Sequence, residues 1–172
     1  MNKKPYILGI CASNSGSGKT YVLERLIPAL KKRGYSVSAI KHAHHNFDID
    51  KPGKDSFKIR EAGAKQTLIF NNTRSALITE SAEQDLDLGK VIEQINQPTD
   101  IILVEGLKTM QIPKIEIYRE QISSERLYIR DPKIIGVMSD IDIKYDIPSF
   151  DFIDLDKLAE FIIKQIKMNN EQ

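Results

Sequence analysis

The feature that most constrains the fold is a glycine-rich segment between a short apolar run and an amphipathic run. Tyr6 to Ala12 is almost wholly apolar, which is typical of a central parallel strand covered on both faces. Ser13-Asn14-Ser15-Gly16-Ser17-Gly18-Lys19-Thr20 follows at once, and Lys19 to Arg33 then carries apolar residues at helical spacing. The segment matches G-x-x-x-x-G-K-[ST], except that Ser13 replaces the first glycine. A strand, this loop and a helix together predict a phosphate-binding loop (P-loop).

The chemistry of the loop explains these residue types. Gly16 and Gly18 allow the backbone to fold its N–H groups around an anion, and the following helix presents its positive end there. Lys19 adds a mobile ammonium group, and Thr20 can offer its hydroxyl to Mg²⁺. We therefore expect nucleotide phosphates to bind to Ser15, Gly16, Ser17, Gly18, Lys19 and Thr20.

Strands and helices alternate along the rest of the chain. The pattern predicts strands around residues 37–40, 66–70, 75–79, 101–104, 114–118 and 134–138, and helices around residues 55–63, 86–95 and 158–166. This alternation predicts an α/β fold of the P-loop NTPase type, with a mostly parallel, doubly wound sheet and helices on both faces. The length of 172 residues fits a single domain, residues 1–172.

Composition excludes several classes of partner. Lys and Arg total 25 and Asp and Glu total 24, so no overall charge favours nucleic acid or an anionic membrane. The apolar run after the N-terminus is too short for a signal peptide or a membrane span. The single cysteine, Cys11, lies in that run and is expected to be a core residue. We expect a cytoplasmic protein.

An acidic residue closes the apolar run Ile101 to Val104. A carboxylate at the end of a neighbouring buried strand commonly holds Mg²⁺ or its water shell in P-loop proteins, so Glu105 and Thr20 are the predicted metal residues. The alternative is that Glu105 caps the turn at Gly106. A Mg²⁺ site is the favoured interpretation.

The segment from Lys41 to Asp55 contains all three histidines, His42, His44 and His45. One interpretation is a transition-metal site, although adjacent histidines lack helical ligand spacing. A second is a switch loop over the nucleotide, with Asp48 and Asp55 as the preferred catalytic carboxylates. A third is a solvated loop without a functional role.

The motifs together resemble one family. They are the phosphate loop, Ile40-Lys41-His42 with His44-His45, Lys51-Pro52-Gly53-Lys54-Asp55-Ser56, Ala62-Gly63-Ala64 and Val104-Glu105-Gly106-Leu107-Lys108. They are similar to those of the molybdopterin-guanine dinucleotide biosynthesis protein B (MobB) family, over nearly the whole chain. That family also accepts a small residue in place of the first glycine of the loop.

The resemblance implies a GTP-preferring P-loop fold, a homodimer and slow intrinsic hydrolysis. It also implies an adapter role beside the guanylyltransferase that attaches GMP to molybdopterin. The sequence lacks Asn-Lys-x-Asp, the motif by which GTPases usually recognise guanine. The candidate for guanine recognition is instead Asp140, after the strand that ends near Met138. The Asp140 carboxylate could accept the N1 and N2 protons of guanine, although a solvated strand end is an equal alternative.

Two other functions remain open at this point. One is a small-molecule kinase whose acceptor site lies beside the γ-phosphate, and the other is a metallochaperone GTPase that uses the histidines. For the homodimer, the segment Ile112 to Arg119 is the expected interface, because Ile115 and Ile117 alternate with polar residues as in a half-buried sheet edge.

Overall fold

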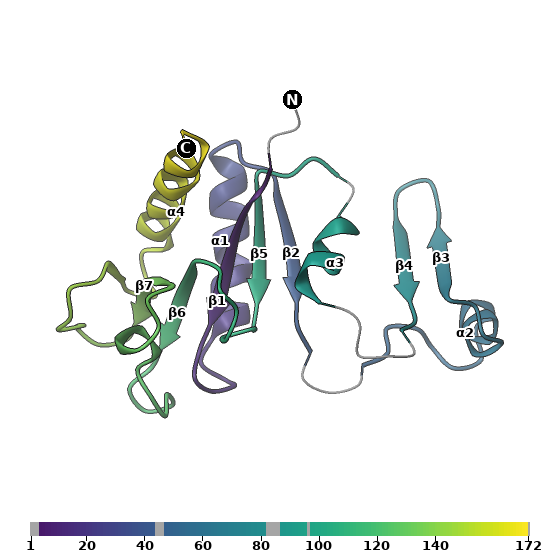
Figure 1. Ribbon diagram of the computed structural model, residues 1–172, viewed down its shortest axis with the longest axis horizontal. Helices are drawn as coiled ribbons and strands as arrows, with labels where there is room; N and C mark the ends of the chain where they lie inside the picture. Colours follow the sequence, from purple (N-terminus) through teal and green to yellow (C-terminus); the bar gives the residue numbers. More distant parts are fainter. Residues whose placement is uncertain (1–3, 44–46, 82–86, 96, 172) are drawn as a thin grey trace. The chain divides into compact units, whose positions relative to one another are not determined.

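The computed structural model describes residues 4–43, 47–81, 87–95 and 97–171. These residues form two compact units (Figure 1): the first spans residues 1–42 and 97–172, and the second spans residues 43–96. Each unit is described here by itself. Folding as one cooperative domain stays a prediction.

The first unit is built on a six-stranded parallel sheet in the order β2-β5-β1-β6-β7-β8. The strands are β1 (Tyr6–Cys11), β2 (Val37–Lys41), β5 (Ile101–Glu105), β6 (Lys114–Tyr118), β7 (Ile134–Ser139) and β8 (Ser149–Phe150). The chain leaves β1 toward β2 on one side and later adds β6 and β7 on the other, which makes the carboxyl end of β1 a topological switch point.

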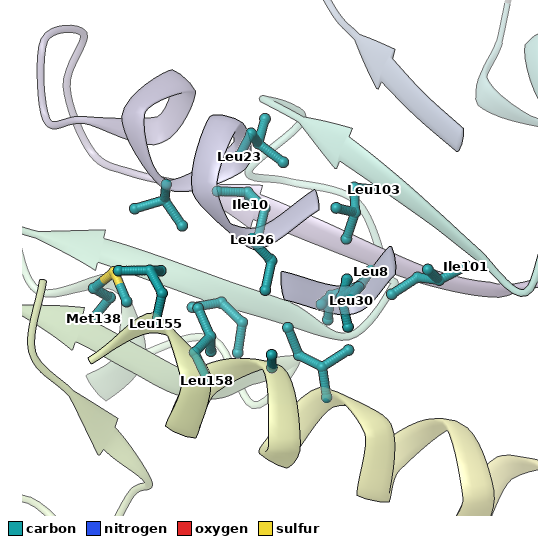
Figure 2. Close-up of a cluster of buried hydrophobic side chains, with 14 of the residues drawn as sticks. Leu8, Ile10, Leu23, Leu26, Leu30, Ile101, Leu103, Met138, Leu155 and Leu158 are labelled. Atoms are coloured by element: carbon teal, nitrogen blue, oxygen red, sulfur yellow. The ribbon is translucent and has the colours of Figure 1, made fainter. Parts of the chain in front are cut away.

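Two long helices pack against one face of this sheet (Figures 1 and 2), namely α1 (Lys19–Lys32) and α4 (Leu155–Asn170). Both helices are amphipathic, and their buried faces include Leu26, Leu30 and Leu158. These side chains meet Leu8 and Ile10 of β1 in one continuous core (Figure 2). The core therefore anchors both strand β1 and helix α1, the two elements that hold the glycine-rich loop between them.

A second hydrophobic cluster is formed by the side chains that the same strands direct to the other face of the sheet. Cys11 and Val137 pack there with Tyr118 and Tyr128, the latter from the short 3-10 helix η1 (Leu127–Ile129). Cys11 is fully buried, as the sequence predicted, and burial is the main cause that raises the pKa of its thiol to about 12. The cysteine is a core residue and is not a reactive thiol.

The second unit contains α2 (Asp55–Glu61), α3 (Leu88–Glu93) and an antiparallel hairpin of β3 (Gln66–Phe70) and β4 (Ser75–Thr79). The strand bounds agree with those predicted from the sequence.

Across the described residues, no helix combines the length and apolar character needed to cross a lipid bilayer.

The prediction that the segment from Ile112 to Arg119 forms a sheet edge is wrong. The strand lies between β1 and β7, and all five of its residues are buried. The alternation of Lys114 and Glu116 with isoleucines suggested a half-solvated strand, but both charged side chains are fully buried and paired. The reason is that each finds partners inside the fold, so their charge does not report solvent exposure.

Candidate functional site

The glycine-rich loop joins the end of β1 at Cys11 to the start of α1 at Lys19. Gly16 and Gly18 have φ angles of 76° and 99°, in the left-handed region that glycine occupies without strain. Gly18 is the N-cap residue and supplies no side-chain cap for the first turn of α1. The first N–H groups of this 14-residue helix are thus available to an anion.

Hydrogen bonds within the loop set its shape. The Ser17 hydroxyl is fully buried and donates to the Asn14 carbonyl at 3.0 Å, and the Lys19 ammonium donates to the same carbonyl at 3.0 Å. The Asn14 side-chain oxygen accepts from the Ser13 hydroxyl at 2.7 Å and from the Ser124 amide at 2.8 Å. Ser13, which replaces the first glycine of the motif, therefore contributes to the hydrogen-bond network of the loop.

The predicted metal residues lie together beside the loop. The Thr20 hydroxyl oxygen is 3.3 and 3.4 Å from the two carboxylate oxygens of Glu105, which closes β5. Strand β5 is the direct neighbour of β1, and Ile10 pairs with Glu105. The Glu105 side chain is 12% exposed, and the Lys41 ammonium lies 3.4 Å from one of its oxygens. A hydroxyl and a carboxylate form an all-oxygen set of the kind that Mg²⁺ prefers.

A cavity of about 530 Å³ lies at the end of β7. Asp140, the predicted base-reading residue, lines it and accepts a hydrogen bond from the Glu120 amide at 3.1 Å. Residues from β8 and the segment after it complete the wall, and they include Phe150, Asp151, Phe152 and Ile153. The cavity has the mixed apolar and acidic lining that a purine base with exocyclic N–H groups can use.

Arg119 connects this cavity with the glycine-rich loop. Its Nε donates to the Ser17 carbonyl at 3.1 Å, and its guanidinium stacks 3.9 Å above the Phe152 ring centre. One guanidinium nitrogen lies 3.8 Å from the Asp140 carboxylate. Arg119 therefore places the cavity beside the glycine-rich loop.

Comparison with known proteins identifies the family. The sequence profile described as "Molybdopterin guanine dinucleotide synthesis protein B" matches residues 7–140, well over half of the chain. The chain belongs to this family. The molybdopterin-guanine dinucleotide biosynthesis adapter protein of Escherichia coli (strain K12) is 42% identical over 163 residues, with 92% of this chain and 93% of the relative covered. The adapter protein of the same name from Haemophilus influenzae (strain ATCC 51907 / DSM 11121 / KW20 / Rd) is 39% identical, with 94% and 90% covered.

A solved structure of a family member has the same fold. The crystal structure of molybdopterin-guanine biosynthesis protein B superimposes with a TM-score of 0.75 at 26% identity, covering 92% of this chain and 99% of that one. The predicted fold class, a mostly parallel α/β sheet of the P-loop NTPase type, is thereby confirmed.

The carboxylates predicted as catalytic belong to the second unit, where they have structural partners. Asp48 accepts a hydrogen bond from the Asp50 amide at 2.9 Å and pairs with Arg60, and these two contacts, in that order, lower its pKa. The Asp55 side chain is 96% exposed in the first turn of α2, 3.6 Å from Lys58. These contacts do not test a role in hydrolysis, so catalytic roles for Asp48 and Asp55 stay predictions.

Of the three histidines, only His42 belongs to the described residues, and His44 and His45 lie outside them. The His42 amide donates to the Glu105 carbonyl at 3.0 Å, which places the start of the histidine segment at the end of β5. Among the residues that the structure describes, no cluster of three His, Cys, Asp or Glu side chains could hold a metal ion. The three-histidine site is therefore neither supported nor tested.

Sequence reasoning missed Arg119 and Lys41. Each stands at or directly after the carboxyl end of a parallel strand, Lys41 as the last residue of β2 and Arg119 directly after β6. In open α/β sheets, ligands bind at this edge, so the position itself was a usable signal. The signal was hidden because the order of the strands in the sheet does not follow their order in the sequence.

Proposed function

We propose that this chain is a GTP-binding adapter in molybdopterin-guanine dinucleotide biosynthesis, with weak intrinsic GTPase activity. Nucleotide binding is supported by the conformation of the loop from Ser13 to Thr20. The Lys19 ammonium folds back over this loop at the uncapped N-terminus of α1. The adapter role rests on family membership and on the names of the relatives in Escherichia coli and Haemophilus influenzae. The protein is expected to work in the cytoplasm.

The preference for GTP rests on Asp140. One of its carboxylate oxygens accepts the Glu120 amide, and the other lies 3.8 Å from Arg119. A carboxylate oxygen can accept more than one hydrogen bond, so Asp140 has capacity for the N1 and N2 donors of guanine. Adenine presents an acceptor at its N1 and no exocyclic group at its C2, so the same carboxylate would face unpaired acceptor atoms. The base preference should therefore favour GTP over ATP.

Thr20 and Glu105 are the proposed Mg²⁺ residues, acting directly or through the water shell of the metal. Mg²⁺ supplies charge neutralisation between the β- and γ-phosphates. Thr20 and Glu105 orient that ion against the phosphate loop. Hydrolysis should be slow because Arg119, which reaches the loop, is engaged with the Ser17 carbonyl and the Phe152 ring.

Calorimetric titration with GTP and ATP, with and without Mg²⁺ and with the purified guanylyltransferase, tests the proposal. Lys19→Ala should weaken GTP binding by about tenfold or more, because a charge-assisted contact to phosphate is lost. Thr20→Ala should weaken binding mainly when Mg²⁺ is present, and Glu105→Gln should lower hydrolysis. A matched control is Lys164→Met, which removes an exposed charge on α4. A folded Lys19→Ala variant with parental GTP affinity would refute the phosphate site.

Turnover separates the adapter from a small-molecule kinase. Slow hydrolysis that no small acceptor accelerates, together with nucleotide-dependent binding to the guanylyltransferase, is the expected result. Acceptor-stimulated turnover would favour the kinase. Stoichiometric Ni²⁺ or Zn²⁺ binding that is lost on substitution of His42 would favour the metallochaperone.

We also propose a homodimer, with the β3–β4 hairpin as its contact surface. Leu68, Phe70 and Leu77 share one face of the hairpin and are 60%, 76% and 43% exposed, and Leu68 pairs directly with Leu77. A two-stranded hairpin with an exposed apolar face is marginally stable in water, which favours a covering surface. The apolar face of a second copy is self-complementary and fits a two-fold interface.

Light scattering at micromolar concentration tests the dimer. Leu68→Lys should give a monomer, while Met168→Lys, a change on the exposed side of α4, should leave the mass unchanged. A monomeric parent would end the dimer proposal, and a dimeric Leu68→Lys variant would move the interface elsewhere.

A further inference from the structure

Lys41 belongs to the Ile40-Lys41-His42 motif, and its side chain reaches the proposed metal residues. It is the last residue of β2 and pairs in register with Glu105 of β5. Its ammonium lies 3.4 Å from a Glu105 carboxylate oxygen. The Lys41 side chain is 67% exposed and the Glu105 side chain only 12%. A long, mobile cation thus reaches from solvent to a nearly buried carboxylate.

The Glu105 carboxylate requires a positive partner. The Thr20 hydroxyl is 3.3 and 3.4 Å from its two oxygens, but a hydroxyl has a single proton to donate and carries no charge. A carboxylate withdrawn from water is unfavourable unless a charge or a metal compensates it. The Lys41 ammonium, 3.4 Å away, supplies that charge.

Mg²⁺ at Thr20 and Glu105 would replace this cation. A divalent ion on the same carboxylate repels a nearby ammonium and neutralises the oxygens that held it. The freed ammonium would then be available to a phosphate oxygen of the bound nucleotide, since an ammonium is a strong donor to anionic oxygens. The Lys41 side chain is 67% exposed, so a change of its rotamer would disturb little packing.

We propose that Lys41 is an exchangeable counter-ion: it holds the Glu105 carboxylate in the nucleotide-free protein and transfers to the terminal phosphate when Mg²⁺·GTP binds. This inference rests on the proposed GTP- and Mg²⁺-binding function. It adds a residue that distinguishes GTP from GDP, because only GTP carries the γ-phosphate. No bond is made or broken in the exchange.

The exchange predicts two effects of opposite sign for Lys41→Met. Mg²⁺ titrated into the protein saturated with GDP should bind about two- to fivefold more tightly, the size expected for a largely exposed ion pair that no longer competes. A non-hydrolysable GTP analogue with Mg²⁺ should bind about tenfold more weakly, because a charge-assisted phosphate contact is lost. A surface ion pair without this role would give neither effect.

Isothermal titration calorimetry on the full chain provides both measurements. Lys41→Arg should keep the parental preference for the GTP analogue, and Lys164→Met, which removes an exposed lysine on α4, should reproduce both parental values. In a Glu105→Gln background, Lys41→Met should no longer tighten Mg²⁺ binding, since the carboxylate for which it competes is absent. This loss would identify Glu105 as the shared partner.

The outcomes separate the two proposals. A parent protein that binds no nucleotide refutes the proposed function and this inference together. A parent that binds Mg²⁺·GTP normally while Lys41→Met changes neither affinity, or weakens both equally, refutes the exchange alone.

Discussion

Removing the Asp131 carboxylate should destabilise the protein far more than removing the lysine that it faces. The Lys114 ammonium is fully buried in the central strand β6, donates to the Met110 carbonyl and lies 2.8 Å from an Asp131 oxygen. The Asp131 side chain is 25% exposed. The two partners therefore differ in their access to water, and this difference sets the cost of each substitution.

Asp131→Asn leaves a buried ammonium without a counter-charge, which costs about 3–5 kcal/mol when a buried pair is broken in this way. Lys114→Met leaves a carboxylate that water can reach and one carbonyl without its donor, for which about 1–2 kcal/mol is expected. The double variant should recover much of the loss, because no buried charge remains. Urea unfolding at pH 7, followed by circular dichroism, gives the three free energies.

The dependence on pH has a definite sign. Burial by itself raises the pKa of Asp131, but the Lys114 ammonium and the Lys133 amide together bring it below the usual value of 3.8. A carboxyl with a lowered pKa in the folded state contributes stability above about pH 3.8, and that contribution is lost as the pH falls through the folded-state pKa. The difference between the parent and Asp131→Asn should therefore shrink in acid. Equal costs for the two single variants at pH 7 would contradict this reasoning.

Three further predictions follow from other contacts. Gly9→Ala should cost about 1–3 kcal/mol in thermal unfolding, because its Cβ would lie 2.7 Å from the Lys114 Cγ; parental stability would show that the Lys114 stem can move. Burial is the main cause that raises the pKa of Glu116 above 4.5, so its contribution to stability is present below pH 4.5 and lost as the pH rises through the folded-state pKa. Glu116→Gln should remove this loss of stability with rising pH. Parallel pH profiles of stability for the parent and the variant would contradict the prediction. Arg119→Ala should weaken GTP binding by about tenfold in calorimetry, whereas Arg130→Ala, an exposed control, should not.

The sequence predicted the elements whose patterns are local. Tyr6 to Ala12 is continuously apolar because the strand is covered on both faces. The backbone conformation of the glycine-rich loop is predictable from Gly16 and Gly18, which adopt positive φ angles. The contact between Thr20 and Glu105, 85 residues apart, was also predictable. In P-loop proteins a carboxylate at the end of a neighbouring strand commonly faces the Ser or Thr that ends the loop motif.

The position of β6 was not predictable from its own residues. The alternation of Lys114 and Glu116 with two isoleucines predicts a strand with one solvent-exposed face. The burial of both charged residues is explained only by the groups with which they pair in the folded chain. These partners are the Asp131 carboxylate for Lys114, and the Leu127 and Tyr128 amides for Glu116. They lie 11 to 17 residues further along the chain, in the short 3-10 helix η1 and the turn after it, where no apolar periodicity predicts their position.

The two buried charges on β6 have a further consequence for the site, because each fixes a loop. Lys114 holds the Met110 carbonyl, in the segment that follows Glu105, and Glu116 accepts the amides that begin η1. A buried charged group adds little net stability compared with an apolar residue of equal volume, so the presence of both groups here is better explained by the positions they fix than by energy. Apolar side chains would fill the same space but could not fix the carbonyl and the amides in direction. The strand directly beside β1 thus orients the segment around Met110 and the start of η1, and Arg119, just beyond its end, donates to the Ser17 carbonyl of the glycine-rich loop.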